Sequence, residues 1–447
     1  MYILTNGRLI TRDPDARGYY EKGAVVYEGS KIVEVGEEAA LTAKYPQAEK
    51  IDAKGGVIMP ALINAHTHIY SALARGLSIV GNNPTNFLEV LEGTWWAIDR
   101  HLTLEGTRAS ADALYIDCIK QGVTTVFDHH ASYCQIPGSL FQIGESAKKF
   151  GIRSCLCYEV SDRDGEEKCL EAIRENADWI TYCREHNDPM LAAMFGGHAL
   201  FTISDKTFDR MVEANNGRTG YHIHVSEGMN DVYDSLQNYG RRPVQRLQDH
   251  GILGEKTILG HCIHVNTAEM ELIRETGTMV VNNPESNMGN AIGICPVLQL
   301  YKRGILLGMG TDAYTNDMLE SLKVALCSQR SQNCLPNVGW CEVTDMLFKN
   351  NAKIGEKYFP DTLGVLKADA AADIIVMDYK PFTPFSDENI DGHMIFGMTG
   401  RQCQTTIAAG KLLMKDRELV GIDEEAENAH ILEASRKLWG TLNHREY

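Results

Sequence analysis

The sequence predicts an α/β protein in which a TIM-type (β/α)8 barrel carries a small β-sandwich domain built from both chain ends. Three observations indicate this fold. Eight apolar, strand-like runs alternate with helical segments through the middle of the chain, further strand-like runs stand at both ends, and polar residues recur where the central runs end. Apolar strands that alternate with helices are typical of a parallel sheet covered by helices, and eight such units are what a barrel requires.

The central runs are short, rich in Val, Ile, Leu and Ala, and separated by segments with helical periodicity such as "TLEGTRASADALYIDCIKQ" and "TAEMELIRE". In chain order they are "GGVIMPALINAHTH", "GVTTVFDHH", "IRSCLCYEV", "MLAAMFGGHAL", "TGYHIHVSE", "KTILGHCIH", "GTMVVNNPES" and "GILLGMGTD". A doubly wound open sheet is the alternative. It is disfavoured because the first strand-to-helix turn has no Gly-rich dinucleotide loop.

The two chain ends share the same sequence pattern, that of short strands rich in Val, Ile and Tyr. "MYILTNGRLITRD" and "GAVVYEGSKIVEVGE" stand at the start, and "ADIIVMDY", "QTTIAAGKLLMKD" and "RELVGID" near the end. Neither end alone has enough strands to bury a core. We therefore expect residues 1–58 and 364–447 to form one composite domain, with a C-terminal helix, around a barrel over residues 59–363.

The last helical segment, "AHILEASRKLWGTLN", leaves the oligomeric state open. Its apolar residues Ile431, Leu432, Leu438 and Leu442 fall roughly on one helix face. That face could pack on the chain's own barrel or on a second copy, so a homodimer is possible.

Composition and charge narrow the function to a cytoplasmic enzyme of small molecules. The net charge of −17 disfavours nucleic acid as a partner, because two polyanions repel. No apolar run reaches the roughly 18 residues of a membrane span, and the first residues lack the layout of a signal peptide. The 12 cysteines are scattered without a C-x-x-C pair, which suits free thiols in a reducing cytoplasm.

The residues with chemical capability stand at the C-terminal ends of the central runs, which in a barrel meet at one mouth where active sites lie. They are His66, His68, Asp128, His129, His130, His198, His224, His261, Asn283 and Asp312. Taken singly, each has an ordinary structural explanation, such as a buried histidine bonded to backbone or an aspartate capping a helix. Their shared position at strand ends favours a common site.

Four of these residues form a candidate metal-ligand set. His66 and His68, in "NAHTHIYSALARG", are two apart on a strand and so point the same way. His224 is favoured over His222 as the third ligand because it lies nearer the strand end and precedes Glu227. With Asp312, three imidazoles and one carboxylate suit a single Zn²⁺ or Fe²⁺ that keeps an open position for water.

Such a metal would serve hydrolysis, since it lowers the pKa of a bound water from about 16 to about 7 and makes hydroxide available at neutral pH. The metal-bound hydroxide would attack an sp² carbon. Glu227 could pass a proton to a ring nitrogen, His261 could polarise the developing oxyanion, and Asp312 could accept the proton of the water.

Five motifs in order resemble the metal-dependent amidohydrolase superfamily, and its aminohydrolase branch of cytosine, guanine, triazine and adenosylhomocysteine hydrolases in particular. They are "PALINAHTH", "HIHVSE", "LGHCIH", "NNPESNMGNAIGICPV" and "GTDAYTND". The resemblance extends over nearly the whole chain. It implies a distorted (β/α)8 barrel with a two-ended β-sandwich, metal ligands at His66, His68, His224 and Asp312, and proton shuttles at Glu227 and His261.

Two further stretches, "WWAIDRHL" and "VFDHHAS", resemble the SsnA group of aminohydrolases, which is associated with purine catabolism. This resemblance implies an oxidised purine or a related fused heterocycle as substrate. The chain departs from the family pattern at Ala61, where Pro-Gly is usual, and at Asn282 and Asn283, where many relatives have a histidine. The run "MLAAMFGGHAL" ends without the lysine that bridges two metals in some relatives, so one metal is expected.

The candidate substrate-binding residues surround the expected mouth. Arg75 could hold a carbonyl or an anionic ring nitrogen with its fork of donors, and His129 and His130 could donate to ring carbonyls. Trp95 could stack on a planar heterocycle or simply pack in the core. The resemblance adds His198 as a substrate contact and Asn283 as a group that orients the substrate.

Two reactions remain open for the same machinery. Attack at a carbon that bears an exocyclic amine releases ammonia, whereas attack at a carbon with ring nitrogens alone opens the ring. The resemblance to the SsnA group favours ring opening of an oxopurine, and a deaminase of guanine, 8-oxoguanine, pterin or cytosine is the alternative. A catalytically inactive relative that acts as a binding protein is disfavoured, because no expected metal ligand has been lost.

Overall fold

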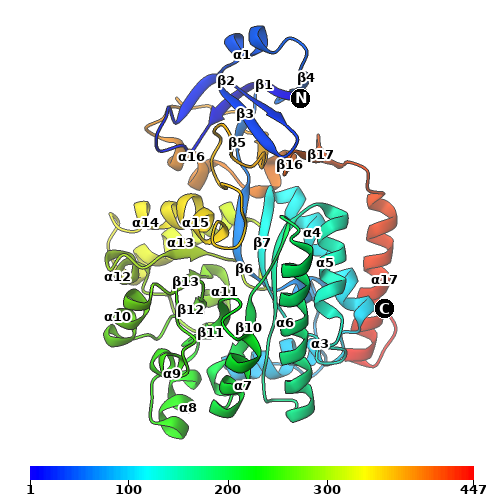
Figure 1. Ribbon diagram of the computed structural model, residues 1–447, viewed down its shortest axis with the longest axis vertical. Coiled ribbons are helices and arrows are strands. Elements are labelled where there is room, and N and C mark those ends of the chain that lie inside the picture. Colours follow the sequence, from blue (N-terminus) through cyan, green and yellow to red (C-terminus); the bar gives the residue numbers. More distant parts are fainter.

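The computed structural model describes residues 1–447, which form a barrel with a β-rich domain above it (Figure 1). The first barrel sheet holds β6 (Leu62–Thr67), β7 (Val123–His130), β8 (Arg153–Tyr158) and β9 (Leu191–Ala193). The second holds β10 (Phe195–Ala199), β11 (Tyr221–Val225), β12 (Ile258–His261), β13 (Met279–Asn282) and β14 (Leu307–Met309). All neighbours in both sheets are parallel.

Two isolated parallel bridges join the sheets into a closed barrel, one between Val160 and Gly197 and one between Thr67 and Asp312. The predicted (β/α)8 barrel is therefore confirmed, and the open-sheet alternative is wrong. The barrel is distorted because its fourth strand is broken at Met194. The Met194 N–H donates to Leu156 on one sheet, whereas the next N–H, of Phe195, donates to Gly220 beside the other.

Helices surround the barrel, as the alternating pattern predicts. They are α4 (Leu104–Gln121), α5 (Ser139–Phe150), α6 (Glu166–His186), α7 (Asp205–Asn215), α8 (Met229–Tyr239), α9 (Pro243–Asp249), α10 (Thr267–Thr276), α11 (Pro284–Gly289), α12 (Val297–Lys302), α13 (Met318–Asn333), α14 (Trp340–Asp345), η4 (Met346–Asn350) and α15 (Asn351–Gly355). Local sequence sets their limits. In α10, for example, Asn266 and Glu269 form a reciprocal capping box, and Gly277 ends the helix at a φ of 68°.

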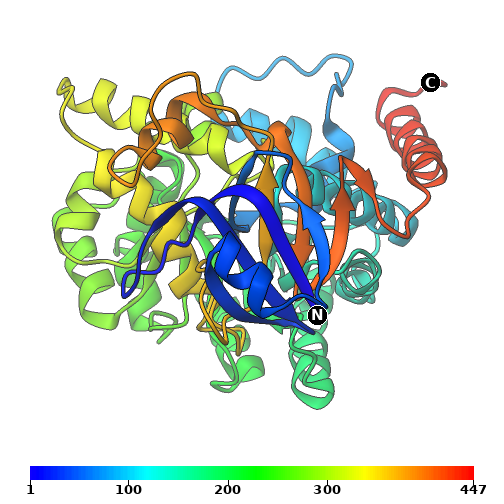
Figure 2. The same cartoon turned by 90° about the horizontal axis from the view of Figure 1, so that it is seen from above.

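Strands from both chain ends form the β-rich domain, which is confirmed. They are β1 (Tyr2–Ile10), β2 (Tyr19–Glu28), β3 (Lys31–Glu37), β4 (Glu49–Asp52), β5 (Val57–Pro60), β15 (Ile374–Met377), β16 (Cys403–Ala408), β17 (Lys411–Lys415) and β18 (Glu418–Leu419). They are hydrogen-bonded into one nine-stranded sheet, in which β5 pairs with β15 and so joins the two ends of the chain. Seen from above, the blue N-terminal strands lie beside the orange ones (Figure 2). The helices α1 (Glu38–Lys44) and α16 (Ile390–Gly397) and the turn η5 (Gly400–Gln402) complete this part.

The two parts of the molecule are tied together at the start of the barrel strands. The first predicted run divides at Ala61, since β5 belongs to the end sheet and β6 to the barrel. Arg153, fully buried at the start of β8, forms an ion pair with Asp373 next to β15 and a longer one with Asp361. Removing one partner of a buried ion pair typically costs about 3 to 5 kcal/mol, so this contact holds the domains in register.

The C-terminal helix α17 (Glu424–Asn443) leaves the β-rich domain and packs on the barrel helix α4 (Figure 1). Leu438 is buried in the barrel core, and the Trp439 Nε1–H donates to the Leu73 carbonyl at 2.7 Å. The helix thus packs on the barrel of its own chain, which is one of the two arrangements considered from the sequence. Leu432 on this helix is 50% exposed.

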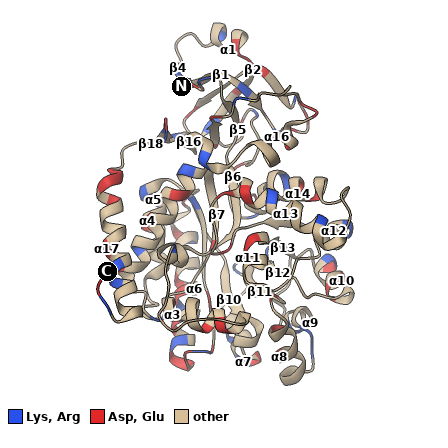
Figure 3. Cartoon of the chain, turned by 180° about the vertical axis from the view of Figure 1, so that it is seen from behind, with Lys and Arg blue, Asp and Glu red and all other residues tan.

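Charged residues of both signs are mixed across the outer helices (Figure 3). None of the helices combines the length and the apolar character that crossing a membrane demands. All 12 cysteines carry free thiols.

Candidate metal centre and substrate cavity

Four side chains predicted from the strand ends meet in the barrel mouth. His66 and His68 come from the end of β6 and the residue after it, His224 from β11, and Asp312 from the loop after β14. His68 Nε2 lies 2.9 Å from Asp312 Oδ1 and 3.2 Å from His224 Nε2. His66 Nε2 lies 3.9 Å from the same carboxylate oxygen. We call these four residues the metal cluster.

The tautomers of the metal cluster leave ring lone pairs facing one another. The His68 Nδ1–H donates to the His129 carbonyl at 2.5 Å, and the His224 Nδ1–H donates to the His198 carbonyl at 2.9 Å. Carbonyl groups that hold one ring nitrogen in this way aim the other at a metal.

The geometry fits a tetrahedral cation. Two nitrogens at 2.0 to 2.1 Å from a tetrahedral zinc ion lie about 3.3 Å apart, and the two Nε2 atoms here lie 3.2 Å apart. His66 Nε2 is buried without a hydrogen-bond partner. Two lone pairs and an orphaned nitrogen beside a carboxylate are stabilised by a cation, so the residues present fit a metal ion.

Of the two histidines on β11, His224 is the one that enters the metal cluster. His222 Nε2 lies 2.8 Å from His66 Nδ1, on the far side of the His66 ring. With His66 Nε2 free, the His66 Nδ1–H is the donor in that contact. His222 therefore orients His66 instead of joining the cluster.

Asp312 is held by backbone and by a hydroxyl. The backbone N–H groups of Thr311 and Asp312 donate to the His66 carbonyl at 2.9 and 3.0 Å, and the Ser286 hydroxyl donates to Asp312 Oδ2. Burial alone would raise the pKa of Asp312, but the His68 and His261 rings and the Ser286 hydroxyl outweigh it and keep that pKa below its usual range.

Asp312 and His261 both adopt a left-handed backbone, with φ of 55° and 67°. For a residue other than glycine this costs of the order of 1 to 3 kcal/mol, and such strain persists where the surrounding structure holds it. Here both strained residues stand at strand ends in the mouth. In this conformation the two side chains lie close together, with His261 Nε2 3.7 Å from Asp312 Oδ2.

Glu227 lines the space in front of the metal cluster, and the fully buried His261 lies next to it. His261 Nε2 lies 3.6 Å from Glu227 Oε2 and 3.7 Å from Asp312 Oδ2. The His261 Nδ1–H donates to Asn287 Oδ1 at 2.8 Å, and the Asn287 amide donates to Asn282 Oδ1, which fixes the orientation of the Asn287 side chain. His261 Nε2 therefore keeps a lone pair, and it lies on the side of Glu227 and Asp312.

The surroundings of Glu227 favour the protonated form of its carboxyl group. Burial, followed by the negative charge of Asp312, raises the pKa of Glu227 well above its usual range. A carboxyl group whose protonated form is favoured thus lies beside an imidazole whose neutral form is favoured, an arrangement suited to proton transfer in both directions.

The metal cluster opens into a cavity between the strand ends and the segment after β6. That segment contains η1 (Ile69–Ala74), α2 (Phe87–Val90), the π-helical turn η2 (Leu91–Trp95) and α3 (Trp96–Asp99). The cavity is lined by His68, Tyr70, Phe87, Leu91, Trp95, Glu159, His198, His224, Glu227, Asn290, Asp312 and Ala313. Its polar end lies at the metal cluster and its aromatic side at Tyr70 and Trp95.

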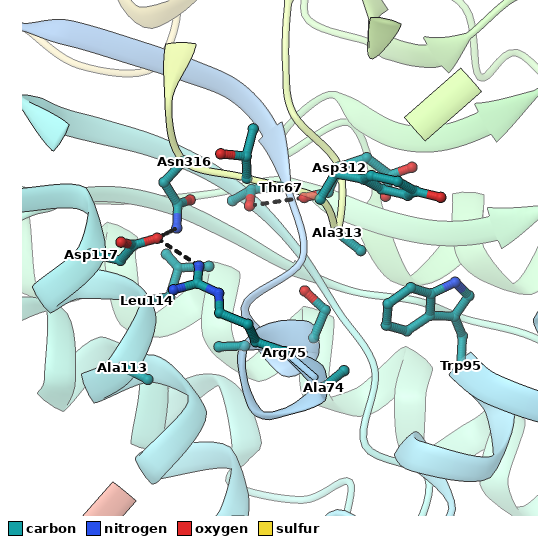
Figure 4. A pocket seen from close by; sticks show the side chains of 14 residues that line it. Thr67, Ala74, Arg75, Trp95, Ala113, Leu114, Asp117, Asp312, Ala313 and Asn316 are labelled. Carbon is teal, nitrogen blue, oxygen red and sulfur yellow. Dashed lines mark hydrogen bonds and ion pairs between the residues drawn. The ribbon is translucent and has the colours of Figure 1, made fainter. Parts of the chain in front are cut away.

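A second cavity continues outward from the first and shares Trp95, Asp312 and Ala313 with it. Figure 4 shows this outer cavity, with Trp95 and Asp312 at one side and Arg75 and Asp117 at the other. The Arg75 side chain is 72% exposed, and its Nη2 donates to Asp117 Oδ2 at 2.9 Å. Arg75 therefore lies at the outer rim, engaged with a carboxylate of this chain.

The other predicted substrate contacts divide into two groups. Trp95 and His198 line the inner cavity. His129, His130 and Asn283 lie behind its surface and are not among its lining residues.

The three residues behind the surface have partners within the protein. His129 contacts the His222 carbonyl and Glu159, and His130 contacts the Ser132 hydroxyl at 3.1 Å. Asn283 Nδ2 lies 3.5 Å from the His261 ring. We expect these side chains to support the groups in front of them.

Sequence reasoning missed Glu159 and Tyr70. Glu159 directly follows β8, in "IRSCLCYEV", so the strand-end rule that found the other residues also applies to it. Tyr70 lies in η1, and its ring meets the His68 ring edge-on at 5.3 Å. No pattern in the sequence marks it.

The amidohydrolase family matches residues 57–413, and the imidazolonepropionase-like composite domain of bacteria matches residues 23–48. The first match covers most of the chain and contains the whole metal cluster. The chain therefore belongs to the amidohydrolase family, and it is a hydrolase with a metal-binding site.

Relatives extend over the whole length of the chain. A 5'-deoxyadenosine deaminase of Methanosarcina mazei is 30% identical over 453 residues, which covers 99% of each chain. A 5-methylthioadenosine/S-adenosylhomocysteine deaminase of Thermococcus sibiricus is 30% identical over 401 residues, or 88% of this chain and 90% of its own.

Solved structures share the fold at lower identity. An adenosine deaminase of Xanthomonas campestris with bound zinc superposes with a TM-score of 0.86 at 22% identity, covering 98% of both chains. An atrazine chlorohydrolase of Arthrobacter aurescens in complex with zinc has a TM-score of 0.79 at 23% identity and covers 97% of this chain and 100% of its own. The Escherichia coli guanine deaminase has a TM-score of 0.79 at 19% identity, covering 93% of this chain and 100% of its own.

Proposed function

We propose that this chain is a mononuclear metal-dependent deaminase that acts on a purine nucleoside of the 5'-deoxyadenosine type. In this proposal His66, His68, His224 and Asp312 hold one zinc or iron ion. The observation that carries it is the pair of proton-handling groups, Glu227 and His261, which lie 3.6 Å apart beside Asp312 of the metal cluster. The full-length relatives with deaminase names support the choice of reaction.

When bound, the metal would lower the pKa of a water and so supply a nucleophile at neutral pH. The residues of the chain would then move protons. His261 accepts a proton at Nε2, which lies beside Glu227 and Asp312, and Glu227 gives its proton to the ring nitrogen beside the reacting carbon. The net change consumes one water, replaces C–NH₂ by C=O and releases ammonia.

The aromatic side of the cavity suits a planar base. Tyr70 and Trp95 meet edge-on with their ring centres 6.2 Å apart, and both line the cavity next to the metal cluster. A purine ring placed there would have an aromatic face on one side and the polar end of the cavity on the other. The outer cavity would leave room for the group attached to the base.

Ring opening of an oxopurine in purine catabolism is the second candidate. It is supported by the resemblance of "WWAIDRHL" and "VFDHHAS" to the SsnA group, and the same residues would serve it, since only the carbon under attack differs. Deamination of guanine, 8-oxoguanine, pterin or cytosine is a further alternative, and the experiment below distinguishes it from the other two. A cytoplasmic location and a homodimer stay predictions.

The test compares ammonia release with the ultraviolet spectrum for each substrate class. The zinc-loaded and the iron-loaded protein are incubated with 5'-deoxyadenosine, 5'-methylthioadenosine, adenosine, guanine, 8-oxoguanine, pterin, cytosine and urate-type oxopurines. We expect ammonia with a retained purine spectrum from the first two. Loss of ring absorbance would instead establish ring opening.

Metal content is measured on the same samples. We expect one metal per chain and loss of activity in a chelator that is restored by adding the metal back. A protein that binds these ligands but turns over none of them, with its metal in place, would be the inactive binding protein and would overturn the proposal.

A further inference from the structure

Beside the metal cluster, the inner cavity contains a carboxylate oxygen that no protein group satisfies. Glu159 is only 2% exposed, and its Oε1 accepts from His129 Nδ1 at 3.0 Å and lies 3.3 Å from His68 Nδ1. Its Oε2 has no such partner, and the nearest cationic candidate, His198 Nε2, is 3.8 Å away. That distance is too long for a hydrogen bond.

His198 presents a second acceptor next to this oxygen. The Thr202 hydroxyl donates to the Ala199 carbonyl at 2.8 Å, so its oxygen can only accept from His198 Nδ1, at 2.9 Å. The proton of the ring is therefore on Nδ1, and the lone pair of Nε2 is directed away from Thr202. Both Glu159 and His198 line the inner cavity.

Two acceptors cannot satisfy each other, and a ligand that covers them without supplying donors would leave them unsatisfied at a cost in free energy. Glu159 contacts the rest of the protein through two other oxygens. Its Oε1 pairs with His129, and its backbone carbonyl accepts from the Tyr133 hydroxyl at 2.6 Å. The second carboxylate oxygen, Oε2, is left for a molecule in the cavity. Buried polar groups of this kind are what allow a site to reject a ligand that lacks the matching group.

We propose that Glu159 Oε2 and His198 Nε2 form a recognition subsite for two neighbouring hydrogen-bond donors on the substrate. The inference rests on the proposed function and adds the kind of substituent that the substrate must carry. Two sources have this chemistry: the adjacent hydroxyls of a ribose, and the adjacent N–H groups of an oxidised purine. Either would place both donors against the acceptor pair while the reacting carbon lies at the metal cluster.

The first arm of the experiment removes the donors from the ligand. The kcat/KM of the metal-loaded protein is compared for 5'-deoxyadenosine and for its analogues that also lack the 2'-hydroxyl, the 3'-hydroxyl or both. If the ribose is the source, we expect a loss of about 10²-fold for one missing hydroxyl and more for two. The second arm compares oxopurines with their N-methylated analogues, where a similar loss identifies the ring N–H groups.

The second step removes the acceptor from the protein. Glu159→Gln keeps the shape and an oxygen for His129 but places an NH₂ group in the cavity, and His198→Asn tests the partner acceptor. We expect both variants to discriminate less than about 5-fold between a ligand and its donor-free analogue, with the effect mainly in KM and with metal content unchanged. Glu285→Gln, a carboxyl group outside the inner cavity, is the matched control and should discriminate as the unaltered protein does.

An unchanged discrimination ratio in both variants would overturn the subsite, as would an unaltered protein that accepts the donor-free analogues of both arms equally well. Calorimetric binding of the same ligand pairs separates this result from failure of the proposed function. If nothing is turned over, a difference in affinity that disappears in Glu159→Gln still supports the subsite. Equal affinities for all pairs contradict it.

Discussion

Two sides of one cavity are built by different means. The metal cluster stands on strand ends, and carbonyls of neighbouring strands, those of His129 and His198, fix its rings. The other side, which we call the recognition wall, consists of Tyr70, Trp95, Glu159 and His198. Half of it comes from short helical turns after β6 that the barrel itself does not dictate. The barrel strands therefore position the candidate metal ligands, whereas the segment after β6 contributes to the part of the cavity that would contact the substrate.

The largest effect is expected from breaking the metal cluster. His68→Ala removes the ring whose Nε2 lies closest to both Asp312 and His224. We expect kcat/KM to fall by at least about 10³-fold and the bound metal to drop well below one per chain. Elemental analysis and ammonia release measure the two effects. His186→Ala, on the exposed surface of α6, is the control, and a His68 variant that keeps metal and activity would refute the ligand assignment.

Glu227→Gln is expected to slow the catalytic step while leaving metal binding intact. Burial raises the pKa of Glu227 and so favours the protonated form that the proposed proton transfer needs. The amide has the same shape but cannot give up a proton in this way. We expect kcat to fall by about 10² to 10⁴-fold, with metal content unchanged. A variant with normal kcat would show that another group supplies the proton.

The metal cluster is also the part of the site that sequence patterns can predict. The spacing of His66 and His68 and the repeated position at strand ends need no knowledge of long-range contacts. The choice of His224 over His222 also agrees with its position, because strand direction decides which of the two is nearer the mouth. The groups behind the rings, such as the His129 carbonyl, depend on the register between strands and could not be predicted.

The recognition wall was predicted only in part: Trp95 and His198 were named from the sequence, whereas Tyr70 and Glu159 were missed. Arg75 follows His68 by seven residues, but the turn η1 carries the chain outward and leaves the guanidinium with Asp117 at the rim. Glu159 satisfies the strand-end rule, yet a single carboxylate after an apolar strand gives no sign of its buried surroundings. The break at Met194 could not be predicted either. The apolar run there is continuous in the sequence, but its residues are hydrogen-bonded first to one barrel sheet and then to the other.

Trp95→Ala tests the recognition wall directly and should separate it from the metal cluster. Stacking of a base on an aromatic side chain contributes about 1 to 3 kcal/mol by alanine substitution. We therefore expect KM to rise by about 5- to 100-fold while kcat and metal content change little. Trp95→Phe should recover most of the loss because it retains an aromatic face. A fall in kcat with unchanged KM would place Trp95 in core packing instead.

The smallest effect is expected at a carboxyl group that belongs to neither side. Burial, followed by the charges of Glu320 and Asp317, raises the pKa of Glu285 to about 7. The folded chain therefore binds the proton more tightly than the unfolded chain, where the pKa is about 4.3. The stability cost of this group is absent below about pH 4, grows as the pH rises, and is complete above about pH 7.

Glu285→Gln removes that cost without a change in shape. Because the side chain is partly exposed, we expect the variant to be more stable than the unaltered protein by only about 1 to 2 kcal/mol at pH 8, and by nothing near pH 4.5. Urea unfolding at the two pH values measures the difference, with Glu167→Gln on the exposed side of α6 as the control. A gain that is equal at both pH values would contradict the assigned cause, since only a titrating carboxyl group makes the difference depend on pH.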